Sequence, residues 1–169
     1  MTSAKSPAQG RKKTSLRAIK RSLGSREKPM YESTGVVEAS VNTVRKLLTD
    51  VSEGEAGKHN AVLLHDPSGD KVTLKGGPNR FSLPYGSAEV DREKGSFAEM
   101  GNWWYKGIFT AEPHPKGARL VLRVYNHAAK FRMFVPLTQF GLAACATEAM
   151  DKALQRITAA TGLRTYRER

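Results

Sequence analysis

The sequence predicts an α+β domain in which about six or seven antiparallel strands form a curved sheet and one long C-terminal helix packs against it. Three observations support this prediction. Short segments of alternating apolar and polar residues, separated by Gly- and Pro-containing turns, fill the middle of the chain at residues 61–127. A short segment before them, residues 41–51, and a long one after them, residues 136–160, instead repeat apolar residues every three or four positions.

The first patterned segment, residues 31–39, predicts a strand that leads directly into a helix. It contains the β-branched pair Val36 and Val37, and Ser40 follows as a suitable N-cap residue. Apolar residues then recur at helical spacing through residues 41–51. The polar, Gly-containing residues 52–60 predict a loop.

The middle of the chain predicts a series of antiparallel strands. Residues 61–65 and 71–75 flank a turn sequence at 66–70, and this spacing predicts a hairpin. Residues 80–85 again alternate between polar and apolar and predict a strand, which Pro84 favours at an edge of the sheet. Residues 86–95 are mostly polar and predict only pairing at the rim of the sheet. The two clearest strands span residues 100–111 and 118–127 and are joined by a turn with two prolines and a glycine.

Alternation divides the second of these strands into two faces. Leu120, Leu122 and Val124 share the face that we expect to be buried. The opposite face, which we expect to be largely exposed, carries Arg119, Val121, Arg123 and Tyr125.

The C-terminal segment predicts one long helix over residues 136–160. Its apolar stripe consists of Phe140, Ala143, Thr147, Met150, Leu154 and Ile157, and Gly162 stands where a glycine commonly ends a helix. The helix is also rich in small residues, which would leave space above a sheet or allow close packing: Gly141, Ala143, Ala144, Cys145, Ala146 and Ala149.

Positive charge is concentrated at the N-terminus. The 169 residues carry a formal net charge of +12, and nine basic residues with one acidic residue place +8 of it on residues 1–30. Because this segment is also rich in Ser and Gly, we expect a disordered basic tail over residues 1–29 and a domain over residues 30–165. Several roles remain open for the tail: a solvated segment without a partner, a targeting segment, or weak electrostatic contact with nucleic acid or an anionic membrane.

Several classes of protein are not expected. No apolar run is long enough for a membrane-spanning helix, and residues 1–30 lack the apolar stretch of a secretory signal. The single Cys145 allows no internal disulfide. These features predict a cytoplasmic protein. No metal or cofactor is expected either, because the four histidines lack ligand spacing and no nucleotide-binding or triad motif is present.

The order of the predicted elements resembles that of the START-like helix-grip superfamily, which includes SRPBCC and polyketide cyclase/dehydrase-like proteins. The resemblance rests on the opening strand and helix ending at Thr49-Asp50-Val51, on the hairpin formed by residues 103–111 and 119–127, and on the long helix at 136–160. It implies a cavity between the concave face of the sheet and the last helix. Such a cavity would bind a lipid, a polyketide or an aromatic molecule, and some members of the superfamily catalyse cyclisation or dehydration.

Aromatic residues on the clearest strands supply a candidate lining for such a cavity. Alternation from the block Trp103-Trp104-Tyr105 predicts that Trp103, Tyr105 and Phe109 share a face. The expected ligand-binding residues are Trp103, Tyr105, Phe109, Tyr85 and Tyr125. If the protein is a cyclase- or dehydrase-like enzyme, Tyr125 or His127 is the candidate for proton transfer. Ordinary core packing and a polar strand end at the surface are the alternatives, so enzymatic activity remains open.

Overall fold

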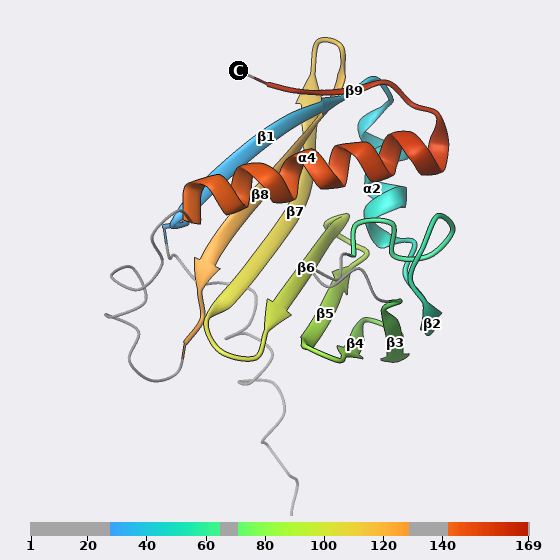
Figure 1. Cartoon of the computed structure of the whole chain (residues 1–169). Coiled ribbons are helices and arrows are strands. Elements are labelled where there is room, and N and C mark those ends of the chain that lie inside the picture. The colour runs from blue at the N-terminus through green and yellow to red at the C-terminus, as the bar shows by residue number, and fades with distance from the viewer. Residues whose placement is uncertain (1–27, 65–70, 129–141, 169) are drawn as a thin grey trace, which may run out of the picture.

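The computed structural model describes residues 28–64, 71–128 and 142–168, and within these residues nine strands form one antiparallel sheet in the order β2-β3-β4-β5-β6-β7-β8-β1-β9 (Figure 1). The strands are β1 (Tyr31–Val37), β2 (Gly54–Glu55), β3 (Thr73–Gly76), β4 (Arg80–Leu83), β5 (Gly86–Asp91), β6 (Ser96–Gly101), β7 (Tyr105–His114), β8 (Gly117–Asn126) and β9 (Thr165–Arg167). The helices in this described part of the chain are α2 (Val41–Thr49) and α4 (Leu142–Thr161).

The predicted α+β class, with a large antiparallel sheet and a C-terminal helix, is confirmed. The open sheet is consistent with a helix-grip arrangement but has more strands than the six or seven expected. Sequence patterning missed β2 and β9 because segments of two and three residues are too short to show a period. Of the predicted tail, residues 1–27 lie outside the described residues, so the proposed division into tail and domain stays a prediction.

The first strand and helix form as predicted. The Oγ atom of Ser40 accepts a hydrogen bond from the backbone N–H of Thr43 at 3.1 Å, which caps α2 at its N-terminus. The helix buries Val44 and Leu48 and contacts β5, β6, β7 and β8. Local sequence signals are therefore sufficient to define this part of the chain.

The predicted strand over residues 61–65 is wrong in its described part, residues 61–64. Ala61 has a φ of 48°, and a hydrogen bond of 2.9 Å from the N–H of Leu64 to the carbonyl of Ala61 closes a turn. All four residues of this turn are buried in the core cluster, so an apolar run here reflects burial and not a strand. The predicted hairpin of 61–65 with 71–75 is also wrong, because β3 pairs with β2 and β4.

Two further expectations about the sheet are corrected. Residues 80–83 form β4 between β3 and β5, so this is not an edge strand, and Pro84 lies just beyond its end. Residues 86–91 form β5, which pairs with β6 along its whole length and not merely at a rim.

The segment predicted as one strand, residues 100–111, is divided by a turn. β6 ends at Gly101 and β7 begins at Tyr105, with residues 102–104 between them. β7 and β8 then form the predicted hairpin around residues 115 and 116. On β8, Leu120, Leu122 and Val124 are buried as expected, whereas Val121 on the opposite face is also buried, against expectation.

The long C-terminal helix is confirmed over Leu142–Thr161, while residues 136–141 of the prediction lie outside the described residues. Gly162 follows it with a φ of 72°, as expected for a glycine that ends a helix. The buried stripe consists of Ala146, Met150, Ala153, Leu154 and Ile157. Ala143, Ala144 and Cys145 are exposed, so these small residues create no space above the sheet.

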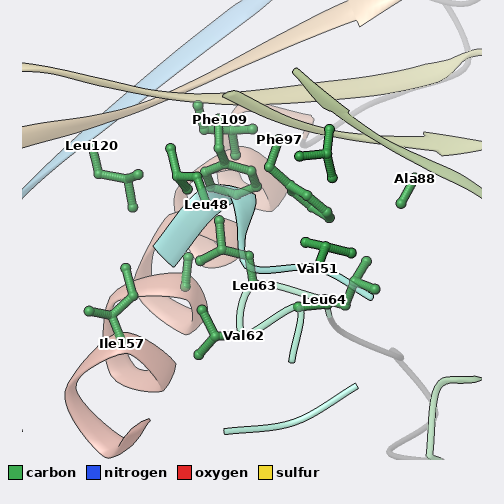
Figure 2. Packing of buried hydrophobic residues seen from close by; sticks show 14 of the residues in the cluster. Leu48, Val51, Val62, Leu63, Leu64, Ala88, Phe97, Phe109, Leu120 and Ile157 are labelled. Carbon is green, nitrogen blue, oxygen red and sulfur yellow. The ribbon is translucent and has the colours of Figure 1, made fainter. Parts of the chain in front are cut away.

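Both helices pack on one face of the sheet, called the inner face below, where α4 lies across β1 and β8 (Figure 1). Side chains from α2, α4, the sheet and the 61–64 turn gather in one hydrophobic cluster, in which Leu48 and Leu63 lie close to Phe97 and Phe109 (Figure 2). The middle of the inner face is therefore filled by the protein's own core. In the described part of the chain, neither helix is both long and apolar enough to cross a lipid bilayer.

Candidate functional site

A carboxyl group lies within the apolar inner face of the sheet. Glu99 is on β6, two residues after the core residue Phe97, and strand alternation gives the two residues the same face. Its partners in the neighbouring strands are Ala88 of β5 and Gly107 of β7. These neighbours are the two smallest residue types, so neither of their own side chains is large enough to cover that of Glu99.

Burial raises the pKa of the Glu99 carboxyl from 4.5 to about 7. Two groups act in the opposite direction: a hydrogen bond with Tyr85, whose hydroxyl donates to the carboxylate, and the positive charge of Arg156. Burial outweighs both of them. The consequence is that protonated and ionised Glu99 are both populated near neutral pH, as a group that exchanges protons requires.

Tyr105 places a hydroxyl group beside this carboxyl. It is the first residue of β7, and its side chain lies along its own strand, so that a Cβ atom at position 107 would come within 2.3 Å of the hydroxyl oxygen. Gly107 therefore provides the space for the hydroxyl. The ring of Trp104 packs edge-on against the ring of Tyr105, with centroids 5.8 Å apart. Burial, and then the charge of Glu99, raise the pKa of Tyr105, so its hydroxyl stays protonated at neutral pH.

Arg156 brings a positive charge to the same place from α4. Its Nη1 atom donates hydrogen bonds to the backbone carbonyls of Leu63, at 3.3 Å, and Leu64. The buried turn at 61–64 thus holds the guanidinium in position. Burial lowers the pKa of Arg156, whereas the charges of Glu99 and Tyr85 raise it. We call Glu99, Tyr85, Tyr105 and Arg156 the polar cluster.

The polar cluster borders a set of partly exposed aromatic side chains. Tyr31, Tyr85, Trp104 and Tyr105 all pack against the hydrophobic core without being fully buried. Each ring is packed against the core and partly exposed, so each keeps some ring surface that suits contact with a flat apolar molecule.

The structure brings together two of the five residues expected to bind a ligand, Tyr85 and Tyr105. Phe109 shares the inner face but is only 4% exposed and belongs to the packed core (Figure 2). Trp103 is 50% exposed in the turn between β6 and β7. The structure therefore does not place Phe109 or Trp103 in the polar cluster.

The two residues named for proton transfer also lie elsewhere. Tyr125 pairs with Lys106 and alternates with the inward-facing Val124, so it belongs to the opposite, outer face of the sheet. His127 follows the end of β8 and is exposed, with its Nε2 atom 3.3 Å from the carbonyl oxygen of Gly101.

Sequence reasoning missed Glu99 and Arg156. Glu99 carries a charge inside an apolar segment, two residues after Phe97, and Arg156 lies on the long helix between the buried residues Leu154 and Ile157. A charged residue next to residues of the apolar core is the sequence feature that could have identified them. Among the described residues, no group of three or more His, Cys, Asp or Glu side chains is arranged to hold a metal ion.

The chain matches no protein-family model and no curated protein. Two solved structures are similar to it in fold. TTHA0849 from Thermus thermophilus has 16% identity over 78% of this chain and 99% of its own, with a TM-score of 0.42. The KanY protein (ms6282) has 15% identity over 79% of this chain and 97% of its own, with a TM-score of 0.44. At these identities and TM-scores, neither likeness assigns a family or an activity to the chain.

Proposed function

We propose that the protein binds a largely apolar small molecule through a hydrogen-bonding group that meets the polar cluster. The observation that carries this proposal is the buried carboxyl of Glu99, which lies on an apolar sheet face beside two tyrosines and an arginine. The resemblance to helix-grip proteins, which hold hydrophobic molecules beneath their last helix, agrees with it.

Stability alone does not account for the polar cluster. Removing a carboxyl group from water is unfavourable, and an apolar residue of similar size at the same position is commonly neutral or stabilising. The raised pKa of Glu99 shows that its partners do not fully compensate its burial. Groups perturbed in this way are concentrated at functional sites, where they recognise or act on a ligand.

The surroundings of the polar cluster define the kind of molecule that fits. Trp104 and Tyr105 offer ring surface, while the hydroxyl of Tyr105 and the carboxyl of Glu99 offer a hydrogen-bond donor and an acceptor. The matching ligand is a fused-ring or similarly flat molecule that carries a hydroxyl or carbonyl group at one end.

A matched pair of probes tests this proposal. 2-Naphthol and naphthalene share a ring system and differ by one hydroxyl, so calorimetric titration of both measures the contribution of the polar cluster. We expect 2-naphthol to bind the wild-type protein about fivefold more tightly, because one hydrogen bond to a buried partner contributes on the order of 1 kcal/mol. Glu99→Leu should remove the preference, whereas Tyr125→Phe, on the outer face, should preserve it.

Two results would contradict the proposal. One is the absence of saturable binding by either probe. The other is a preference for 2-naphthol that persists unchanged in Glu99→Leu, since the hydroxyl would then be recognised elsewhere.

A further inference from the structure

Glu99, a possible proton acceptor, and the hydroxyl of Tyr105, a hydrogen-bond donor, lie close together on the inner face of the sheet. The hydroxyl of Tyr105 lies over Gly107, and Gly107 is the direct partner of Glu99 in the neighbouring strand. Cα atoms paired in this way are about 5 Å apart in antiparallel sheets. The Tyr105 hydroxyl therefore lies over the strand position next to Glu99, and a small polar group bound there is within reach of both side chains.

We propose that this site transfers a proton at a carbon atom next to a carbonyl group, with Glu99 as the base and the Tyr105 hydroxyl as the donor to the carbonyl oxygen. This inference rests on the proposed binding function. It assigns a reaction class to the site, and it places that chemistry on residues other than Tyr125 and His127.

The environment of Glu99 suits a general base at neutral pH. A base works best when its pKa is close to the pH at which it acts, and burial raises the pKa of Glu99 to about 7. The charged and titratable groups that face it are Tyr85 from the turn between β4 and β5, Tyr105 from β7 and Arg156 from α4. The Tyr85 hydroxyl, which donates to the carboxylate, also orients it.

The Tyr105 hydroxyl suits the role of donor. It lies over Gly107, where a bound carbonyl oxygen would accept a hydrogen bond from it. Its raised pKa keeps the proton on the tyrosine while negative charge develops on that oxygen. The nearby guanidinium of Arg156 adds a positive charge that favours the same anionic state.

The reaction step is balanced without any additional reactant. The C–H bond next to the carbonyl breaks, and its proton forms an O–H bond with the carboxylate of Glu99. The electron pair of the broken bond forms the carbon–carbon double bond of an enolate, while the carbonyl π electrons move to the oxygen that accepts the Tyr105 hydrogen bond. Return of the proton from Glu99 to the same carbon, or to a conjugated one, regenerates a carbonyl compound.

Deuterium exchange into 2-tetralone tests the inference. This bicyclic ketone has the same two-ring frame as 2-naphthol and carries exchangeable hydrogens next to its carbonyl. Proton NMR in D2O follows their loss, and the same samples report binding through shifts of the probe's aromatic signals. We expect the wild-type protein and Tyr125→Phe to accelerate exchange roughly a hundredfold over buffer.

The variants separate the two assigned roles. Glu99→Gln should reduce exchange to the buffer rate, and Tyr105→Phe should slow it while 2-tetralone still binds. In the wild type the exchange rate should rise with pH and level off above about pH 7, because the ionised carboxyl is the active form.

The outcomes distinguish the inference from the binding function. Binding of 2-tetralone with exchange at the buffer rate, or exchange that Glu99→Gln leaves unchanged, would overturn the inference alone. Absence of binding by 2-tetralone and by 2-naphthol would overturn both.

Discussion

The burial of Glu99 makes the stability of the fold depend on pH in a direction that can be calculated. The folded-state pKa is about 7 and the ordinary value is 4.5, so the folded protein binds this proton more tightly than the unfolded chain does. Below about pH 4.5 the carboxyl is protonated in both states and makes no difference. Stability is then lost as the pH rises from 4.5 to 7, and the loss stays constant above that range.

The size of this loss follows from the pKa difference of about 2.5, which corresponds to about 3 kcal/mol of unfolding free energy. Glu99→Gln keeps the shape of the side chain and cannot ionise. The variant should therefore match the wild type near pH 4.5 and exceed its stability by about 3 kcal/mol at pH 8.5.

Urea unfolding at several pH values between 4.5 and 8.5 measures this difference. Comparison of the two proteins at each pH cancels the contributions of all other titrating groups. Glu93→Gln, at an exposed turn position, controls for the amide substitution itself. A stability difference between Glu99→Gln and wild type that does not change with pH would refute the reasoning, because Glu99 would then not be buried as a proton-binding group.

Three further outcomes are expected. Gly86→Ala should destabilise the fold by about 1–3 kcal/mol, because its Cβ would lie 1.9 Å from the backbone oxygen of Met100. Gly107→Ala meets only side-chain atoms, the end of the Tyr105 ring with its hydroxyl and one methyl group of Leu122, so it should weaken 2-naphthol binding more than it lowers stability; equal effects of both variants on urea unfolding would contradict this. Ile157→Ala should destabilise the fold by about 2–5 kcal/mol, whereas Gln155→Ala, on the exposed side of α4, should destabilise it by less than about 0.5 kcal/mol. A small loss from Ile157→Ala in thermal unfolding would show that α4 is not docked as described. Trp103→Phe should remove most of the tryptophan emission that acrylamide can quench, because Trp103 is 50% exposed and Trp104 is less exposed. Strong quenching that remains in that variant would be inconsistent with the placement of the two rings.

Elements whose signals are local could be predicted from the sequence. Ser40 caps α2, and Gly162 ends α4 in the left-handed backbone conformation that its position suggested. The hairpin of β7 and β8 follows from strand alternation on both sides of a Pro- and Gly-containing turn. Each of these features depends on residues within about one turn or one strand of each other, so the pattern of the chain is enough.

The buried turn at 61–64 could not be predicted in the same way. A short apolar run fits a strand and a buried turn equally well, and only the φ of 48° at Ala61 distinguishes the two. The partner of its carbonyl groups is Arg156, more than ninety residues further along the chain. Long-range packing decides which backbone N–H and C=O groups form hydrogen bonds and which partners they have.

The candidate site was predictable only in part, because long-range packing brings its residues together. Tyr85 and Tyr105 could be named from residue type and position on strands, and the structure places both beside Glu99. The sequence shows Glu99 only as a charged residue in an apolar segment, and its partners become known once β6 pairs with β7 and α4 brings Arg156 over the sheet. The turn at residues 102–104 interrupts the alternation that was expected to align Trp103 with Tyr105.

The location of a bound probe tests the central claim most directly. Titration of 15N-labelled protein with 2-naphthol should shift the amide signals of Glu99, Gly107 and Arg156 most strongly, with smaller changes on the outer face at Arg123 and Tyr125. Shifts confined to the outer face or to the exposed turn at Trp103, with the signals of Glu99 and Gly107 unchanged, would contradict the assignment of the polar cluster as the binding site.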